Sequence, residues 1–256
     1  KSQLDDIYGW GRNDEGQLGV GFLSEKVEAP TLIKDLCYKG VKQICCQDNY
    51  SAALSIYGAV YVCGSLSGGK LGLGRGQKRG YQLTFRAIPA EVLPEIDYIA
   101  CGMEHMLAIS RVSNEAGAPN PAKPSKGKTY AWGKNHRGQL GIGSKENQFS
   151  PHLIDNTKER FTKVACGYNF SLGLSSGNRV YFWGNFKYGG NAHTRGDLEE
   201  PAVVPGLEQD VKDIACEYKY CVALVEREKK AELKKWGKYL ADKQAPRAEN
   251  KAAGAD

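Results

Sequence analysis

A short motif that occurs four times constrains the fold of this chain more strongly than any other feature of its sequence. In each copy, a strand-like run ends in an aromatic residue or cysteine and then glycine. The clearest copies, residues 8–19 (YGWGRNDEGQLG) and 130–141 (YAWGKNHRGQLG), continue into a glycine-rich turn, and weaker copies are residues 60–64 and 180–184. The copies recur about every 50 residues, with a longer middle interval that holds inserted loops, and this pattern indicates β-propeller blades or a stacked array.

A second pattern alternates with the first and completes the repeat. It consists of an apolar run that ends in cysteine and, after a turn, a short run of small and aliphatic residues. The first run is found at residues 41–46, 96–101, 161–166 and 211–216, and the second at residues 51–54, 106–109, 171–174 and 221–224. Such runs, bounded by Gly, Asn and Ser, are typical of strands and hairpins. Three proline-led runs fit edge strands, because proline cannot donate to a strand ladder.

The composition agrees with an all-β repeat protein. The chain has 31 glycines and few methionines, as expected for many tight turns. We expect one domain over residues 1–225 and a separate segment over residues 226–256. The 8 cysteines form no close CxxC pairs, which favours free thiols in a reducing compartment. No run is long and apolar enough to span a bilayer, so no membrane insertion is expected.

The motif set resembles the RCC1-like repeats (regulator of chromosome condensation). The matches to the family pattern are at residues 10–21, 128–143 and 167–184. Phe170 stands where the family often has His, Glu217 replaces a usual Gly, and the copy at residues 47–74 has GKLG in place of GQLG. The resemblance covers about residues 6–225. It implies a β-propeller with four antiparallel strands per blade.

The two ends of the repeat region supply complementary halves of a blade. Residues 7–33 hold only the second half of a repeat, and residues 211–224 hold only the first half. We therefore expect residues 7–10 to pair with residues 220–224 and close the ring, which hides the sheet edges, as members of the resembling family commonly do. Three whole repeats and two halves make four blades, whereas the family norm is seven. Two alternatives remain open: a small closed ring, or three further blades absent from this sequence.

Four cysteines occupy one repeat position and raise the question of a metal. These are Cys46, Cys101, Cys166 and Cys216. Four thiolates are a ligand set for structural zinc. The favoured interpretation is that each is a small buried residue, because free Cys behaves as a modest hydrophobe and small residues are common there in the resembling family. We predict no metal site and no cofactor.

No constellation of catalytic residues is evident. His105 lies at the repeat position where the family often carries His, which indicates a structural role, and the other histidines are scattered. The sequence has no GxSxG elbow, Walker loop or HExxH motif. The GQLG glycines recur with the blade period and are turn residues. We therefore predict a protein that is not an enzyme and has no catalytic residues.

Two segments are candidates for interaction. Residues 75–81 form a basic loop whose Arg75, Lys78 and Arg79 could contact phosphate or an acidic protein surface, with a solvated loop as the alternative. Residues 226–243 are charged and show helical spacing of apolar residues. The apolar stripe comprises Leu233, Trp236, Tyr239 and Leu240. We expect a C-terminal amphipathic helix that docks on the propeller or in a partner's groove.

These observations rank three functions, and the ranking rests on fold-level analogy. The first is a non-enzymatic protein–protein interaction scaffold, a subunit of a larger, cytoskeletal or ciliary assembly. The second is a guanine-nucleotide exchange factor for a small GTPase, by analogy with the founding family member. Chromatin or nucleic-acid binding ranks last, because the net charge of +6 is mild and forms no basic stripe. The expected compartment is the cytoplasm or cytoskeleton, the cilium included, with the nucleus as the alternative.

The C-terminal segment yields a first prediction. Replacing Trp236 with Ala should loosen the segment or release its partner while the propeller stays folded, because Trp is enriched among interface hot spots and an isolated helix of this length is marginal. Hydrogen exchange at Leu233–Leu240 and co-purification of the partner are the measurements. If neither changes, the segment is a solvated appendage.

Overall fold

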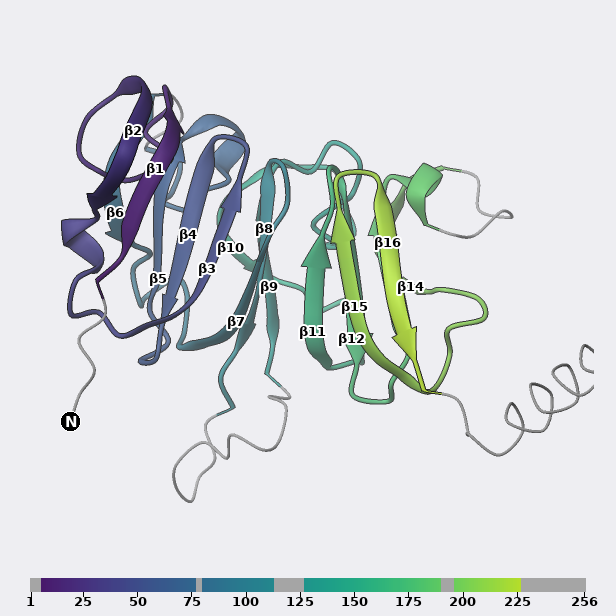
Figure 1. Ribbon diagram of the computed structural model, residues 1–256. Coiled ribbons are helices and arrows are strands. Elements are labelled where there is room, and N and C mark those ends of the chain that lie inside the picture. The colour runs from purple at the N-terminus through teal and green to yellow at the C-terminus, as the bar shows by residue number, and fades with distance from the viewer. Residues whose placement is uncertain (1–5, 77–79, 113–126, 190–195, 227–256) are drawn as a thin grey trace, which may run out of the picture.

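The computed structural model describes residues 6–76, 80–112, 127–189 and 196–226, and these form a row of antiparallel sheets (Figure 1). The N-terminal half-blade comprises β1 (Tyr8–Asn13) and β2 (Ser24–Leu32). The first blade comprises β3 (Val41–Gln47), β4 (Tyr50–Ser55), β5 (Val60–Ser65) and β6 (Tyr81–Ala87). The second comprises β7 (Ile96–Cys101), β8 (His105–Ser110), β9 (Thr129–Gly133) and β10 (Gln148–Leu153).

The row ends with one more blade and a second half. The third blade comprises β11 (Phe161–Cys166), β12 (Phe170–Ser175), β13 (Val180–Gly184) and β14 (Leu198–Val203). The C-terminal half-blade comprises β15 (Val211–Glu217) and β16 (Tyr220–Val225). Short 3-10 turns are found at η1 (Lys34–Leu36), η2 (Ser67–Gly69) and η3 (Phe186–Tyr188). The predicted all-β fold, with four antiparallel strands per complete blade, is confirmed.

The first strands of successive blades lie side by side along the inner side of the row. Strand β3 contacts β7, β7 contacts β11, and β11 contacts β15. The Lys42 ammonium lies 2.8 Å from the Asp97 carboxylate, and Lys163 pairs with Asp213 in the same way two blades further on. Exposed ion pairs of this kind contribute little stability, about 0–1 kcal/mol each. The blades are held together mainly by their apolar faces.

Two of the buried interfaces between blades are centred on the last residue but one of the third strand. Trp132 of β9 and Trp183 of β13 are fully buried against the preceding blade. The Trp132 indole donates a hydrogen bond to the Lys70 carbonyl oxygen at 2.9 Å. A Cβ on Gly72 would lie 2.8 Å from Trp132 Nε1, and a Cβ on Gly141 would lie 2.7 Å from Trp183 Nε1. The aromatic residue of one copy of the motif therefore packs on the glycine turn of the preceding copy.

The local backbone geometry requires a glycine directly after this residue. Gly64, Gly133 and Gly184 have φ values of 107°, 108° and 101°, in the region that favours glycine. A Cβ on Gly133 would lie 2.5 Å from the Glu104 carbonyl oxygen, and equivalent contacts with the second strand occur at the other two. The third strand can approach the second closely only because this residue lacks a side chain.

The predicted pairing of the two chain ends is wrong. β1 pairs only with β2 and β16 only with β15, in separate two-stranded sheets. Figure 1 shows them at opposite ends of the row, β1–β2 in purple and β15–β16 in yellow-green. The physical reason is that each blade packs on the next in a fixed orientation, so three blades and two halves turn through only part of a circle. The Gln47 amide still reaches Glu217 across the inner side, at 3.4 Å.

The departures from the repeat pattern are accommodated locally. Lys70 replaces the glutamine of GQLG and is almost fully buried, with its ammonium donating to Asn49 Oδ1 at 2.9 Å. Burial lowers the pKa of Lys70. The predicted C-terminal helix and its four apolar residues lie outside the described residues.

His105 has the structural role that its repeat position predicts. Its ring is fully buried, and Nε2 shares a hydrogen bond with Ser171 Oγ of the next blade at 2.9 Å. The Tyr50 hydroxyl donates to the His105 carbonyl oxygen at 2.9 Å. Burial lowers the pKa of His105 to about 3, so the ring is neutral at physiological pH. Phe170 takes the same place in the following blade, with its ring equally buried.

His105→Phe should therefore remove a pH dependence. A group whose pKa falls from 6.5 in the unfolded chain to about 3 in the fold contributes stability that is complete above pH 6.5 and is lost as the pH falls towards 3. We expect the free energy of unfolding of the parent to fall by up to about 1.4 kcal/mol per pH unit in that window. The phenylalanine variant, which reproduces the Phe170 arrangement, should show a shallower slope.

Urea unfolding at a series of pH values from 7 to 4 measures this difference. Replacing the exposed His152 with Ala is the control and should leave the slope unchanged. Equal slopes for the parent and His105→Phe would contradict the assignment.

Candidate interaction surface

Large apolar side chains stand at two turns of the first blade, and at the equivalent hairpin the third blade has the small polar residues SSGN, 175–178. Tyr38 lies in the connection from β2 to β3, and Ile56 and Tyr57 lie in the β4–β5 hairpin, with Tyr57 69% exposed. A Cβ on Gly40 would lie 2.9 Å from Ile56 Cγ1 and 3.7 Å from the Tyr57 ring, so the two turns meet here. Tyr38 has a φ of 63°, which is unusual for a residue with a side chain. Such strained positions cluster at functional sites.

An arginine from the next blade is fixed beside these residues. The Arg111 guanidinium donates to the Ile56 carbonyl oxygen at 2.7 Å and lies 3.0 Å from the Glu95 carboxylate. The Arg111 amide also donates to the Glu95 carbonyl oxygen at 2.7 Å. We call Tyr38, Ile56, Tyr57 and Arg111 the hairpin patch. Aromatic residues and arginine are the residue types enriched in the centres of protein interfaces.

An open cavity of about 550 Å³ adjoins the patch at Arg111. Its lining includes Glu95, Arg111, Lys128 and Arg160, so the cationic side chains outnumber the single carboxylate. The patch therefore combines exposed apolar surface with a basic margin. That combination suits a partner whose apolar residues have acidic neighbours.

Of the interaction residues predicted from the sequence, only Arg75 lies in the described part of the chain, and it is not part of this patch. Arg75 is exposed in the turn between β5 and β6, which lies at the end of β5 away from the β4–β5 hairpin. Lys78 and Arg79 lie outside the described residues, as do Leu233, Trp236, Tyr239 and Leu240. Sequence reasoning missed the hairpin patch. The available signal was the hairpin sequence itself, SIYG at residues 55–58, where the third blade has SSGN at residues 175–178.

The inner side of the row holds several thiols and a tyrosine, and among them the hydrogen bond with Cys101 lowers the pKa of Cys45. A cavity of about 210 Å³ is lined by the inner strands, with Tyr98, Cys101 and Cys166 among its walls. Burial raises the pKa of both thiols and raises the pKa of Tyr98 to about 12. Protonated thiols are poor nucleophiles and poor metal ligands.

The repeat-position cysteines behave as individual residues. The Cys166 thiol donates to the Ala100 carbonyl oxygen at 3.5 Å, and Cys46 is exposed at the start of the row. Within the described parts of the chain, no three His, Cys, Asp or Glu side chains are placed to hold a metal ion. The same parts contain no helix with the length and apolarity needed to cross a bilayer.

Four-stranded blades joined by aromatic-on-glycine contacts define the class of protein: a β-propeller built from short sequence repeats. The model of the regulator of chromosome condensation (RCC1) repeat matches residues 5–54 and 126–174, and a second model of the same description matches residues 161–189. The chain belongs to the RCC1-like repeat family. The resemblance found in the motifs is confirmed.

Relatives share this repeat across most of the chain. Ultraviolet-B receptor UVR8 of Arabidopsis thaliana is 31% identical over 204 residues, which is 79% of this chain and 42% of the receptor. E3 ubiquitin-protein ligase HERC2 of Homo sapiens is 29% identical over 242 residues, which is 91% of this chain and 5% of the ligase. The chain thus spans less than half the length of these relatives.

Solved structures show the same fold. Prp20p of Saccharomyces cerevisiae superposes with a TM-score of 0.71 at 24% identity, covering 88% of this chain and 52% of Prp20p. Human WBSCR16 superposes with a TM-score of 0.68 at 19% identity, covering 87% of this chain and 54% of that protein. The arc corresponds to about half of each solved chain.

Proposed function

We propose that this chain is a non-enzymatic scaffold that binds a protein partner through the hairpin patch. The observation that carries the proposal is the exposed pair of tyrosines beside an arginine whose guanidinium is already held in place. Preorganised aromatic and arginine side chains lose little conformational entropy on binding, which favours affinity. The partner we expect presents apolar residues flanked by carboxylates, which the basic margin at Lys128 and Arg160 would attract.

The blade supplies the rigidity that such a surface needs. The Ile56 amide donates to the Gly40 carbonyl oxygen at 2.7 Å, so the two turns of the patch are joined by the main chain. Beneath them, Ala53 and Leu54 of β4 are fully buried. The patch is therefore fixed to a packed sheet.

The activities in the names of the relatives are not assigned to this chain. One relative is a receptor and another is a ubiquitin-protein ligase, and the match covers 5% of that ligase. We carry over neither activity. Our proposal keeps the larger assembly, cytoskeletal or ciliary and in the cytoplasm, that the repeat resemblance led us to expect.

The test begins with site-specific cross-linking in native extracts. A photoreactive amino acid at Tyr57 should capture a defined partner, whereas the same group at Tyr81 should not, because Tyr81 is exposed at the opposite end of the first blade. With the captured partner purified, Tyr57→Ala should weaken binding about tenfold or more, as expected for a hot-spot residue. Tyr81→Ala is the matched control and should leave the Kd unchanged.

Two results would overturn the scaffold proposal. In the first, Tyr57→Ala and Tyr81→Ala bind the partner equally well. In the second, the purified chain accelerates nucleotide exchange on one member of a panel of small GTPases, and an exchange factor then replaces the scaffold as the function.

A further inference from the structure

The inner strand of the first blade carries one cysteine more than its equivalents. β3 has Cys45 and Cys46, whereas β7, β11 and β15 have alanine and then cysteine at the same two positions. Cys46 therefore belongs to the repeat pattern, and Cys45 departs from it. Because alanine satisfies the packing at the three equivalent places, packing alone does not account for the thiol of Cys45.

The extra thiol stands where the repeat brings neighbouring blades together. Between the second and third blades, Cys166 packs in one cluster with Ala100 and donates to the Ala100 carbonyl oxygen at 3.5 Å. Cys45 holds the position of Ala100 one blade earlier, and it packs against the cluster that contains Cys101. The exchange of alanine for cysteine thus brings two thiols together at the contact between the first and second blades.

Hydrogen bonds hold these two thiols in place. The Cys45 thiol donates to the Ile99 carbonyl oxygen at 3.7 Å, and Cys45 and Cys101 share a hydrogen bond. The Gln43 amide donates to the Cys45 sulfur at 3.6 Å and to the Ile99 carbonyl oxygen at 2.7 Å. The Ile99 amide donates back to Gln43 Oε1 at 3.1 Å. Gln43 therefore joins β3 to β7 directly beside the two sulfurs.

The two thiols differ in access and in ionisation. Both line the open cavity of about 210 Å³ on the inner side of the row, where Cys45 is half-buried and Cys101 is buried. The hydrogen bond with Cys101, together with that from Gln43, lowers the pKa of Cys45, whereas burial raises the pKa of Cys101. The thiolate is the nucleophilic form of cysteine. An accessible thiol with a lowered pKa beside a second thiol is typical of cysteine pairs that respond to oxidants.

A metal is a poorer match for this pair than a covalent bond. Structural zinc takes four protein ligands, and no third His, Cys, Asp or Glu side chain in the described ranges is placed to complete such a set. A disulfide needs only two sulfurs, which must approach to about 2 Å. From hydrogen-bond contact, side-chain rotation can supply that approach.

We propose that Cys45 and Cys101 are an oxidative modification site, at which hydrogen peroxide converts the two thiols into a disulfide between the first and second blades. Cys45 is the thiol that reacts with the oxidant, and Cys101 resolves it. Both cysteines are free in the reduced chain. Disulfides of reducing compartments are usually transient in this way. The site is separate from the hairpin patch and does not depend on the scaffold function.

Hydrogen peroxide supplies the oxidising equivalents. The Cys45 thiolate attacks one peroxide oxygen, the O–O bond breaks, and the departing hydroxide takes up a proton to become water. The Cys101 sulfur then attacks the sulfur of the resulting sulfenic acid, the S–O bond breaks, and the hydroxide leaves with the Cys101 proton as a second water. A dithiol reverses the reaction by exchange, and is itself oxidised to a disulfide.

The first test is peptide mapping of the 256-residue chain after a small molar excess of hydrogen peroxide and blocking of the remaining thiols. The expected product is a peptide pair joined through residues 45 and 101, which dithiothreitol separates. Cys45→Ala should abolish this pair, and it should fold normally because alanine is the residue of the other inner strands. Cys46→Ala removes the exposed neighbouring thiol and is the matched control, which should leave the bond intact.

The second test measures what the bond does to the fold. The peroxide-treated chain should unfold at a higher urea concentration than the reduced chain, because the cross-link constrains the unfolded state between residues 45 and 101. Dithiothreitol should reverse the shift. In Cys45→Ala, peroxide treatment should leave the midpoint of unfolding unchanged.

Three outcomes would overturn the proposal. The first is a parent chain that forms no bond between residues 45 and 101. The second is an equal yield of that bond when the chain is oxidised in concentrated urea, since the pair would then owe nothing to the fold. The third is a shift of the unfolding midpoint that is the same in the parent and in Cys45→Ala.

Discussion

The contact of an aromatic ring with the glycine turn of the preceding blade is the interaction on which this structure depends. Trp132 covers Gly72 and Trp183 covers Gly141, and in each case a single added methyl group would collide with the indole. Both residue types therefore recur together along the chain. The contact sets the distance and orientation between neighbouring blades. Because it recurs from blade to blade, each blade packs on the next in the same way. In the first blade Cys63 takes the place of the ring, against Gly19, and a smaller side chain there leaves room for the nearby Phe85.

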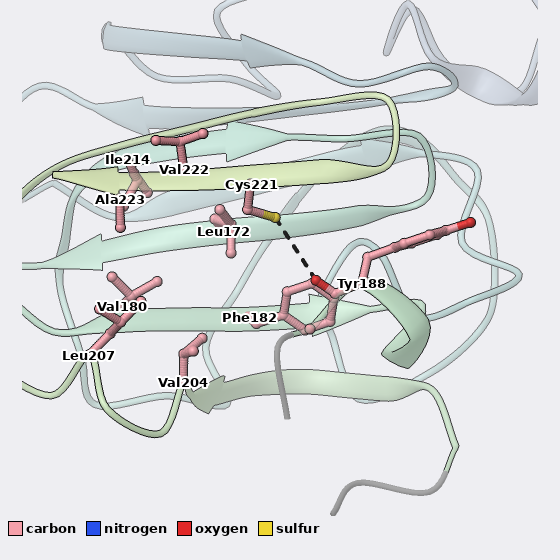
Figure 2. A pocket seen from close by; sticks show the side chains of 11 residues that line it. Leu172, Val180, Phe182, Tyr188, Val204, Leu207, Ile214, Cys221, Val222 and Ala223 are labelled. Atoms are coloured by element: carbon pink, nitrogen blue, oxygen red, sulfur yellow. Dashed lines mark hydrogen bonds between the residues drawn. The ribbon is translucent and has the colours of Figure 1, made fainter. Parts of the chain in front are cut away.

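A structure built in this way is stabilised mainly between neighbours, as in other repeat proteins. Among the described residues, each half-blade lacks the neighbour that buries the equivalent face of a complete blade. Trp10 and Val222 remain exposed for this reason, although their equivalents form the core of the complete blades. The cavity in Figure 2 lies between the third blade and the C-terminal half-blade, where the complete blades have the side chains of a third strand.

The surface available for function lies in the turns, because the strands are occupied by packing between blades. The first blade places Ile56 and Tyr57 in a hairpin and Tyr38 in the adjoining connection, and all three side chains are exposed. Arg111 from the second blade joins them through the Ile56 carbonyl oxygen. In a rigid repeat of this kind the strands pack against one another and the variable turns offer a binding surface. That division of roles agrees with the neutral His105 and the protonated thiols of the interior.

The sequence by itself determined the blades, the phase of their strands and the structural role of His105, because each of these depends on residues close together in one repeat. It did not determine whether β1 and β16 meet, since that depends on the turn between blades, which the packing of whole sheets sets. Nor did it reveal the hairpin patch, whose members come from two connections and a neighbouring blade. Patterns of neighbouring residues predict the structure within one repeat. The total rotation from the first blade to the last, and the contact between turns far apart in the sequence, depend on how whole blades pack.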